Sequence, residues 1–306
     1  MAPKQFPSHE LRGESHMERD IKFFVNNWIF GSVTLAEVAR RAKAIGSDGI
    51  ELVGEPAEYQ VAEVNRIMAD HGLRVQSICG MHPGLDPTDL RLFSHPDVRE
   101  REKAVDYVKA CVDLAKGVGA RSVLVVPSLV GQPAPLVSRE ADLAVAVEPM
   151  HKAAEYAGAQ GVLLTIEPIN RYEVGLVFSV ADAIDLAKRI DHPAMRVMGD
   201  SFHMQIEEGD GIPNAIRRAG HHWFQHMHVA DNTREAPGLG TMPWREILRA
   251  LHDIEFEGGM SLEPLPKGKA PYDARGGNIP AERLDNELRI GLKHLRETQE
   301  LIRVYV

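Results

Sequence analysis

Four residues whose side chains bind hard cations occur at regular intervals in the second half of the chain. They are Glu167, Asp200, His228 and Glu263, separated by 33, 28 and 35 residues. Three carboxylates and one imidazole suit Mn²⁺, Co²⁺ or Mg²⁺ better than a thiolate-rich zinc site would. Because clustered buried carboxylates repel one another without a cation, the pattern predicts a divalent-metal site.

Each of these residues also has an ordinary structural explanation when it is taken alone. A single Glu at a strand end often caps a helix or joins an ion pair. His226 and His228 lie two apart and share a strand face, so either could be a core histidine that hydrogen-bonds to a neighbour. Four such residues at successive strand ends are harder to explain as a solvated surface, which favours the metal site.

The elements that must position these residues are short β-branched runs that alternate with amphipathic helical patterns. We expect strands at 21–27, 49–54, 74–79, 121–126, 161–167, 195–200, 223–229 and 258–263. Eight βα units without a break in composition predict an α/β fold, a single-domain (β/α)₈ TIM barrel. A doubly wound open sheet is the alternative, but no G-x-G-x-x-G follows the first strand. In a barrel, the four residues meet at the C-terminal face.

Several helix ends are marked in the sequence. The apolar stripe over 105–115 is expected to close near Gly117. Ser179 and Asp182 resemble a capping box at the start of a helix. Apolar residues at helical spacing over 284–302 predict a long terminal helix.

The composition is that of an ordinary globular protein and narrows the classes of partner. The chain has 306 residues, 44% of them hydrophobic, and a net charge of −9. This acidic balance argues against binding to nucleic acids or to anionic membranes. No run approaches the about 20 apolar residues of a membrane span. We therefore expect a small-molecule substrate, with no nucleic-acid or membrane partner.

The chain ends and the cysteines bear on domain organisation and location. Residues 1–20 are polar and lack an apolar signal core, so we expect an N-terminal arm followed by a barrel with a C-terminal helix over 21–306. Cys79 and Cys111 are far apart and form no C-x-x-C pair. Two buried thiols in a reducing, cytoplasmic setting are the expectation.

Four segments then show a resemblance to a known family. They are IEPINRYE (166–173), GDSFHMQIEE (199–208), HMHVADNTREAPGLG (226–240) and SLEPL (261–265). In order and spacing they resemble the D-tagatose/D-psicose (ketose) 3-epimerase family, which belongs to the xylose isomerase-like sugar isomerase/epimerase barrels. The resemblance implies that Glu167, Asp200, His228 and Glu263 are the metal ligands, and that Glu167 and Glu263 are also the catalytic acid/base pair.

The resemblance also implies three substrate-binding residues. Glu173 would bind near the C1–C2 end of the sugar, and His203 and Arg234 would be further contacts. Each of the latter two has an alternative role: His203 could cap the helix after the sixth strand, and Arg234 could pair with Glu235 or Asp231 on the surface.

The reaction implied is the interconversion of free ketoses by a metal-dependent ketose 3-epimerase. One carboxylate removes the C3 proton and the other returns a proton to the opposite face. A divalent ion, Mn²⁺ first with Co²⁺ or Mg²⁺ as alternatives, stabilises the enediolate as a Lewis acid. The family also suggests a homodimer or homotetramer.

Other functions stay open on the sequence. An aldose–ketose isomerase would use the same metal and carboxylates between C1 and C2. A lyase subunit of the C-glycoside deglycosidase type would act on 3-keto-glycosides and depend on a partner subunit. A nuclease like the apurinic endonucleases is disfavoured by the net charge of −9 and by the single four-ligand set. A non-catalytic sugar-binding barrel has no use for two opposed carboxylates on one metal.

The long segments after strands are expected to form the substrate mouth. The irregular stretches 80–97 and 127–138 follow the third and fourth strands. Residues 267–280 follow Glu263 and could cover the site or join a subunit interface. Because these segments depart from the family pattern, they leave the identity of the sugar open.

Overall fold

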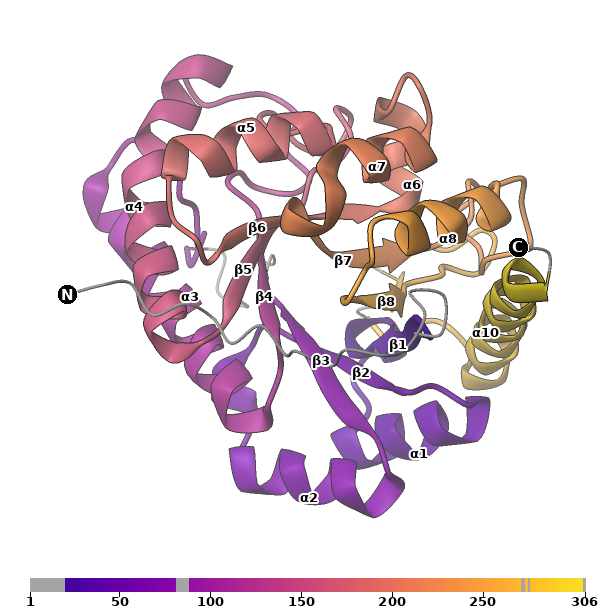
Figure 1. The fold of residues 1–306 in the computed structure, drawn as a ribbon. Coiled ribbons are helices and arrows are strands. Elements are labelled where there is room, and N and C mark those ends of the chain that lie inside the picture. Colours follow the sequence, from indigo (N-terminus) through magenta and orange to yellow (C-terminus); the bar gives the residue numbers. More distant parts are fainter. Residues whose placement is uncertain (1–19, 81–87, 271–272, 275, 305–306) are drawn as a thin grey trace, which may run out of the picture.

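The strands form a closed parallel barrel. The computed structural model describes residues 20–80, 88–270, 273–274 and 276–304. In the described part of the chain, every strand pairs in parallel with the next, and the last pairs with the first, in the order β1 to β8. Figure 1 shows these strands at the centre of the molecule with helices around them. The predicted single-domain (β/α)₈ TIM barrel is therefore confirmed.

The strands fall within the predicted runs or match them. They are β1 (Lys22–Asn26), β2 (Gly49–Val53), β3 (Arg74–Cys79), β4 (Ser122–Val125), β5 (Leu163–Ile166), β6 (Met195–Asp200), β7 (Phe224–Val229) and β8 (Gly259–Leu262). Strands β3 and β6 have the predicted bounds, and the others are shorter by one or two residues at one or both ends.

The helices that surround the barrel follow the strands in chain order. They are η1 (Asn27–Phe30), α1 (Leu35–Ile45), η2 (Pro56–Glu58), α2 (Val61–His71), α3 (Val98–Val118), α4 (Arg139–Gln160), α5 (Val180–Ile190), α6 (Ser201–Glu207), α7 (Ile212–Trp223), α8 (Trp244–Asp253) and α10 (Ala281–Val304). Here η1 and η2 are short 3₁₀ helices. No helix within the described residues is long and apolar enough to cross a membrane.

The predicted helix signals are borne out. The Ser179–Asp182 capping box is present at the start of α5, and the terminal helix is α10. Helix α3 closes near Gly117, as predicted. It ends at Val118, and Gly119 caps it at φ +72°. Gly117 lies within the helix, and a Cβ at this position would come 2.8 Å from Val61 Cγ2 of α2. That glycine serves close packing between helices.

The lower barrel is filled by apolar side chains, and polar groups appear toward the C-terminal ends of the strands. Phe24 of β1 is fully buried. It fits against β8 because position 259 is glycine, where a Cβ would come 2.6 Å from the Phe24 ring. Above this layer the interior holds charged residues, which is unusual for a barrel core of branched apolar side chains.

The loops at the C-terminal ends of the strands only partly fall within the described residues. The stretch 127–138 connects β4 to α4 as predicted. Of the other predicted mouth segments, 81–87, 271–272 and 275 lie outside the described residues, as do residues 1–19 of the predicted arm.

Candidate active site

The four predicted metal ligands converge at the C-terminal end of the barrel. Glu167 directly follows β5, and Asp200 is the last residue of β6. His228 lies on the neighbouring strand β7, where it pairs in register with Asp200 of β6. Glu263 follows β8, with its backbone N–H donating to Val229 of β7. All four side chains are buried, as the strand-end spacing requires in a closed barrel.

His228 lies at the centre of this cluster. Its Nδ1 is 3.2 Å from Glu167 Oε1 and 3.2 Å from Glu263 Oε1. One ligand atom each from Glu167, Asp200 and His228 lie within 4.8 Å of one another. Ligand atoms about 2.1 Å from a common ion and at right angles to each other are about 3.0 Å apart. The spacing around His228 Nδ1 therefore fits ligands of one divalent ion.

Two unsatisfied atoms point to the same conclusion. Among the described residues, Glu167 Oε2 and His228 Nδ1 are buried without a hydrogen-bond partner. A buried polar atom normally has a partner, since leaving it unpaired costs about 1–3 kcal/mol. Carboxylate oxygens and an imidazole nitrogen are donors that Mn²⁺, Co²⁺ and Mg²⁺ accept. The residues present thus fit a bound divalent cation.

The electrostatics of the cluster reflect its excess of carboxylates. Burial, followed by the nearby charges of Asp200, Glu167 and Glu51, raises the pKa of Glu263 to about 7 against the effect of His228. Burial opposes a charge on His228, but Glu263, Glu51 and Glu167 outweigh it and raise the pKa of His228 well above its usual value. Carboxylates crowded in this way favour a positive charge among them.

Two side chains from the β1 end hold Glu263 in place. Asn26 Nδ2 donates to Glu263 Oε1 at 2.7 Å, and Trp28 Nε1 donates to the same oxygen at 3.1 Å. Sequence reasoning identified neither of these hydrogen bonds. Asn26 ends an apolar strand, and that inward-facing amide was the available signal.

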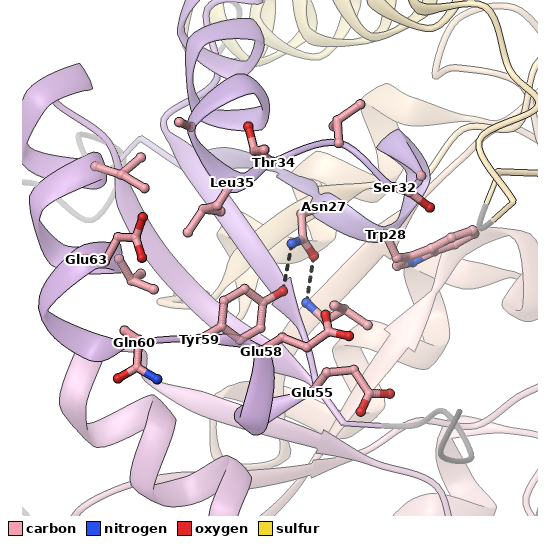
Figure 2. Close-up of a pocket in the computed structure, with 16 residues that line it drawn as sticks. Asn27, Trp28, Ser32, Thr34, Leu35, Glu55, Glu58, Tyr59, Gln60 and Glu63 are labelled. Carbon is pink, nitrogen blue, oxygen red and sulfur yellow. Dashed lines mark hydrogen bonds between the residues drawn. The ribbon is translucent and has the colours of Figure 1, made fainter. Parts of the chain in front are cut away.

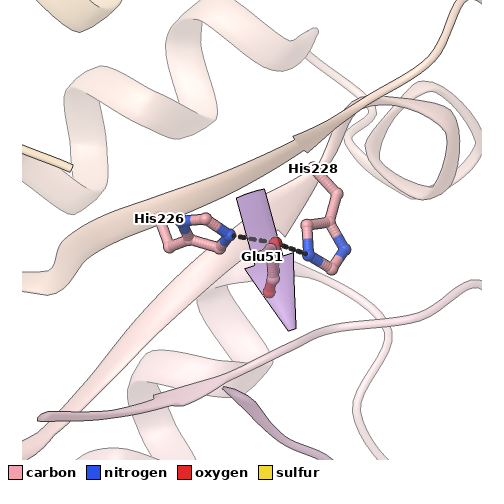
Figure 3. Close-up of side chains that lie close together, drawn as sticks. All are labelled: Glu51, His226 and His228. Carbon is pink, nitrogen blue, oxygen red and sulfur yellow. Dashed lines mark hydrogen bonds and ion pairs between the residues drawn. The ribbon is translucent and has the colours of Figure 1, made fainter. Parts of the chain in front are cut away.

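A third supporting residue, Glu51, lies beneath His228. Figure 3 shows its carboxylate between the rings of His226 and His228. Glu51 Oε2 is 3.0 Å from His226 Nε2 and 3.1 Å from His228 Nε2. Sequence reasoning missed Glu51, although an acidic residue within the apolar strand GIELV was a usable signal.

The predicted substrate contacts Glu173 and His203 are joined by one amide. Asn170 Nδ2 donates to Glu173 Oε1 at 2.9 Å and to His203 Nδ1 at 2.7 Å. This bond leaves the proton of neutral His203 on Nε2, which lies 3.8 Å from Asp200 Oδ2. The alternative capping role for His203 is wrong, because Asp200 caps α6 by accepting from Phe202 N.

Within the described residues, Arg234 forms no ion pair with Glu235 or Asp231. The Asp231 carboxylate instead accepts from Trp244 Nε1 and from loop N–H groups. The Arg234 guanidinium lies over the Phe202 ring, 4.7 Å from its centroid, and in the described chain its Nε is buried without a partner. Burial would raise the pKa of Asp200, but His203 and Arg234 help to lower it. Arg234 therefore acts electrostatically on the candidate metal cluster.

A cavity of about 510 Å³ lies on the β1–β2 side of the barrel and is lined by residues of η1, α1, η2 and α2. In Figure 2, Asn27 bonds to Tyr59 across the cavity, and Trp28 lies at its side. Trp28 is shared by the two regions, since it lines the cavity and also bonds to Glu263. Glu58 and Glu63 add carboxylates to the rim. The charge there suits a neutral or cationic ligand better than a phosphorylated one.

The fold and the cluster define a TIM barrel with a carboxylate-rich candidate metal centre at its mouth. Comparison of the chain with known protein families supports the same fold. The chain belongs to the xylose isomerase-like TIM barrel family, whose model matches residues 39–297.

Relatives within this group act on sugars. The chain is 30% identical over 260 residues to the D-psicose 3-epimerase of Ruminiclostridium cellulolyticum, covering 82% of this chain and 80% of that protein. It is 25% identical to the 3-dehydro-D-guloside 4-epimerase of Escherichia coli, covering 83% and 96%. The solved D-psicose 3-epimerase of Clostridium cellulolyticum H10 with D-tagatose shares the fold, with a TM-score of 0.79 at 24% identity over 91% of this chain and 99% of that one.

Proposed function

We propose that this protein is a divalent-metal-dependent ketose 3-epimerase acting on free ketoses. The observation that carries the proposal is the position of His228 Nδ1, 3.2 Å from a carboxylate oxygen of both Glu167 and Glu263. The similarity to D-psicose 3-epimerases over most of the chain supports the same assignment.

In this proposal the metal ligands are Glu167, Asp200, His228 and Glu263. The unpaired buried atoms Glu167 Oε2 and His228 Nδ1 support it. Mn²⁺ is our first choice because oxygen-rich ligand sets with one imidazole suit hard cations. When bound, the ion supplies Lewis-acid polarisation of the sugar carbonyl.

Glu167 and Glu263 are proposed as the acid/base pair. They follow β5 and β8, two strands that are not neighbours, so they can approach a sugar from different sides. One removes the proton from C3, and the other delivers a proton to the opposite face, with the roles exchanged in the reverse reaction. Burial raises the pKa of Glu263, which opposes the lowering of that pKa that a bound cation would cause.

Glu173, His203 and Arg234 are proposed to bind the sugar. The Nε2–H of His203 and the guanidinium of Arg234 are donors for sugar oxygens and for the negative charge that develops on deprotonation. Asn170 orients both Glu173 and His203 through its amide.

A homo-oligomer and a cytoplasmic location complete the proposal. The two cysteines are buried free thiols, which supports a reducing environment.

A second candidate is an epimerase that acts next to the ketone of a 3-keto-glycoside. The cavity beside Trp28 favours it, since about 510 Å³ is in the range that holds ligands larger than one sugar. The relationship to the 3-dehydro-D-guloside 4-epimerase is consistent with it. The same carboxylate pair would remove a proton next to that ketone.

Metal removal and reloading test the proposal. The protein is stripped with a chelator, reloaded with Mn²⁺, Co²⁺ or Mg²⁺, and incubated with D-fructose, D-tagatose, D-psicose, ketopentoses and a methyl 3-keto-glycoside. We expect a C3 epimer from at least one free ketose only after reloading. Turnover confined to the keto-glycoside would favour the second candidate. Equal turnover before and after chelation would contradict metal dependence.

A further inference from the structure

Glu51 has no place among the proposed ligands or substrate contacts, yet its location is costly. It lies in the middle of β2 with an exposed fraction of 0%, inside the barrel. Barrel interiors are normally filled by branched apolar residues. A buried carboxylate is expensive to desolvate unless other groups compensate it. A packing role alone would be met better by an apolar side chain.

The compensation comes from two imidazoles of β7. One oxygen, Oε2, is 3.0 Å from Nε2 of His226 and 3.1 Å from Nε2 of His228. Since an ionised carboxylate only accepts hydrogen bonds, each Nε2 must be the donor. Neutral His228 then carries its lone pair on Nδ1, the nitrogen that faces Glu167 and Glu263.

His226 completes the arrangement from below. Its ring meets the His228 ring edge-on, with centroids 5.3 Å apart and planes at 84°. The hydroxyls of Ser77 and Ser261 lie 3.4 Å from His226 Nε2. His226 is fully buried, so its ring and the second hydrogen bond restrain the Glu51 carboxylate under His228 (Figure 3).

We infer that Glu51 is a positioning residue of the metal centre, which holds His228 in the tautomer and orientation that present Nδ1 to the ion. The inference rests on the proposed function, because it takes His228 as a ligand. Carboxylates that accept from the distal N–H of a metal-bound His act in this way, and their loss lowers metal affinity about 10- to 100-fold.

The test measures Mn²⁺ affinity without any substrate. Wild type, Glu51→Ala and Glu51→Gln are stripped, and the Kd for Mn²⁺ is measured by competition with a fluorescent chelator. We expect Glu51→Ala to raise the Kd about 10- to 100-fold. Glu51→Gln keeps an acceptor oxygen, so we expect it to recover part of that loss. Glu208→Ala, which removes a buried carboxylate at the end of α6 that accepts from Val180 N at 2.8 Å, is the matched control and should leave the Kd unchanged.

A second readout separates positioning from a general loss of structure. Nitrogen NMR of histidine-labelled protein reports which His228 nitrogen carries the proton. With diamagnetic Mg²⁺ bound in place of Mn²⁺, we expect His228 to carry its proton on Nε2 in wild type and in Glu51→Gln, and a smaller fraction of this form in Glu51→Ala. Circular dichroism melts identify any variant that does not fold, in which case Glu51→Gln alone decides.

Distinct outcomes would overturn the inference and the function. If wild type binds Mn²⁺ and both Glu51 variants bind it within twofold with an unchanged tautomer, Glu51 is not a positioning residue. If wild type itself has no Mn²⁺ site, the proposed metal centre fails, and the inference fails with it.

Discussion

Strands β5 to β8 and strands β1 to β4 serve the same centre in different ways. The later half supplies groups at the strand ends, where Glu167, Asp200, His228 and Glu263 face one another. The earlier half supplies side chains that hydrogen-bond to these groups. Asn26 donates to Glu263, and Glu51 accepts from His228.

This difference shows that the proposed reacting groups and some of the residues that orient them come from different halves of the barrel. Groups that would touch a metal or a sugar stand at the C-terminal ends of β5 to β8, and hydrogen bonds from the earlier half orient two of them, Glu263 and His228. Changes in the later half should therefore abolish turnover, and changes in the earlier half should weaken it by modest factors.

The largest effect is expected from the acid/base pair. Glu263→Gln or Glu167→Gln removes a proton-transfer group, so we expect kcat/KM for ketose epimerisation to fall about 10³-fold or more. Initial rates at saturating Mn²⁺ measure this. Glu282→Gln, on the exposed first turn of α10, is the control. A Glu263→Gln variant with more than a tenth of wild-type activity would contradict the assignment of proton transfer to the later half.

A smaller effect is expected when an early-half hydrogen bond is removed. Trp28→Phe keeps an aromatic ring and removes the N–H that donates to Glu263 Oε1 at 3.1 Å. A hydrogen bond to a charged group contributes about 1.5 kcal/mol, so kcat/KM should fall about tenfold. Steady-state kinetics test this, with a thermal melt to verify folding. A loss as large as that of Glu263→Gln would show that the two halves do not divide the work as argued.

A change in the outer helix layer of the later half should affect stability alone. Ser179→Ala removes the side-chain acceptor for Asp182 N in the α5 capping box. We expect the free energy of unfolding to fall by about 1 kcal/mol, measured by urea denaturation, with kcat/KM unchanged. Ser179→Thr keeps a hydroxyl and should recover most of the loss. A drop in turnover for Ser179→Ala at full folding would count against the local role of α5.

The smallest expected effect depends on pH. Burial raises the pKa of the Glu208 carboxyl, although it accepts from Val180 N at 2.8 Å. The stabilisation from the protonated form is therefore present below the unfolded pKa of about 4.3 and is lost as pH rises through the folded pKa. Glu208→Gln stays neutral, so its Tm relative to wild type should be higher at about pH 7.5 than at about pH 4.5. Melts at both pH values test this, and the opposite trend would contradict it.

The sequence predicted the strands and the four-residue cluster because both depend on local pattern. Short β-branched runs identified the strands, and a residue spacing near one βα unit identified Glu167, Asp200, His228 and Glu263. Barrel closure then brings strand ends together whatever the details of side-chain packing. Motif similarity added Glu173, His203 and Arg234.

What the sequence did not predict depends on contacts across the barrel. Glu51 meets His228 over a separation of 177 residues, and no local period records such a contact. The packing role of Gly117 was not predicted for the same reason. Gly117 resembles a stop signal, but it lies inside α3 to admit Val61 of the adjacent helix.

Proton exchange in D₂O tests the central claim most directly. The Mn²⁺-loaded protein is incubated with D-fructose, D-tagatose, D-psicose and ketopentoses, and the sugars are analysed by NMR. The account predicts that deuterium enters C3 together with a new C3 epimer, and that Glu263→Gln abolishes both. Deuterium at C1 or C2 with aldose formation, or no exchange in any ketose with the metal bound, would contradict it.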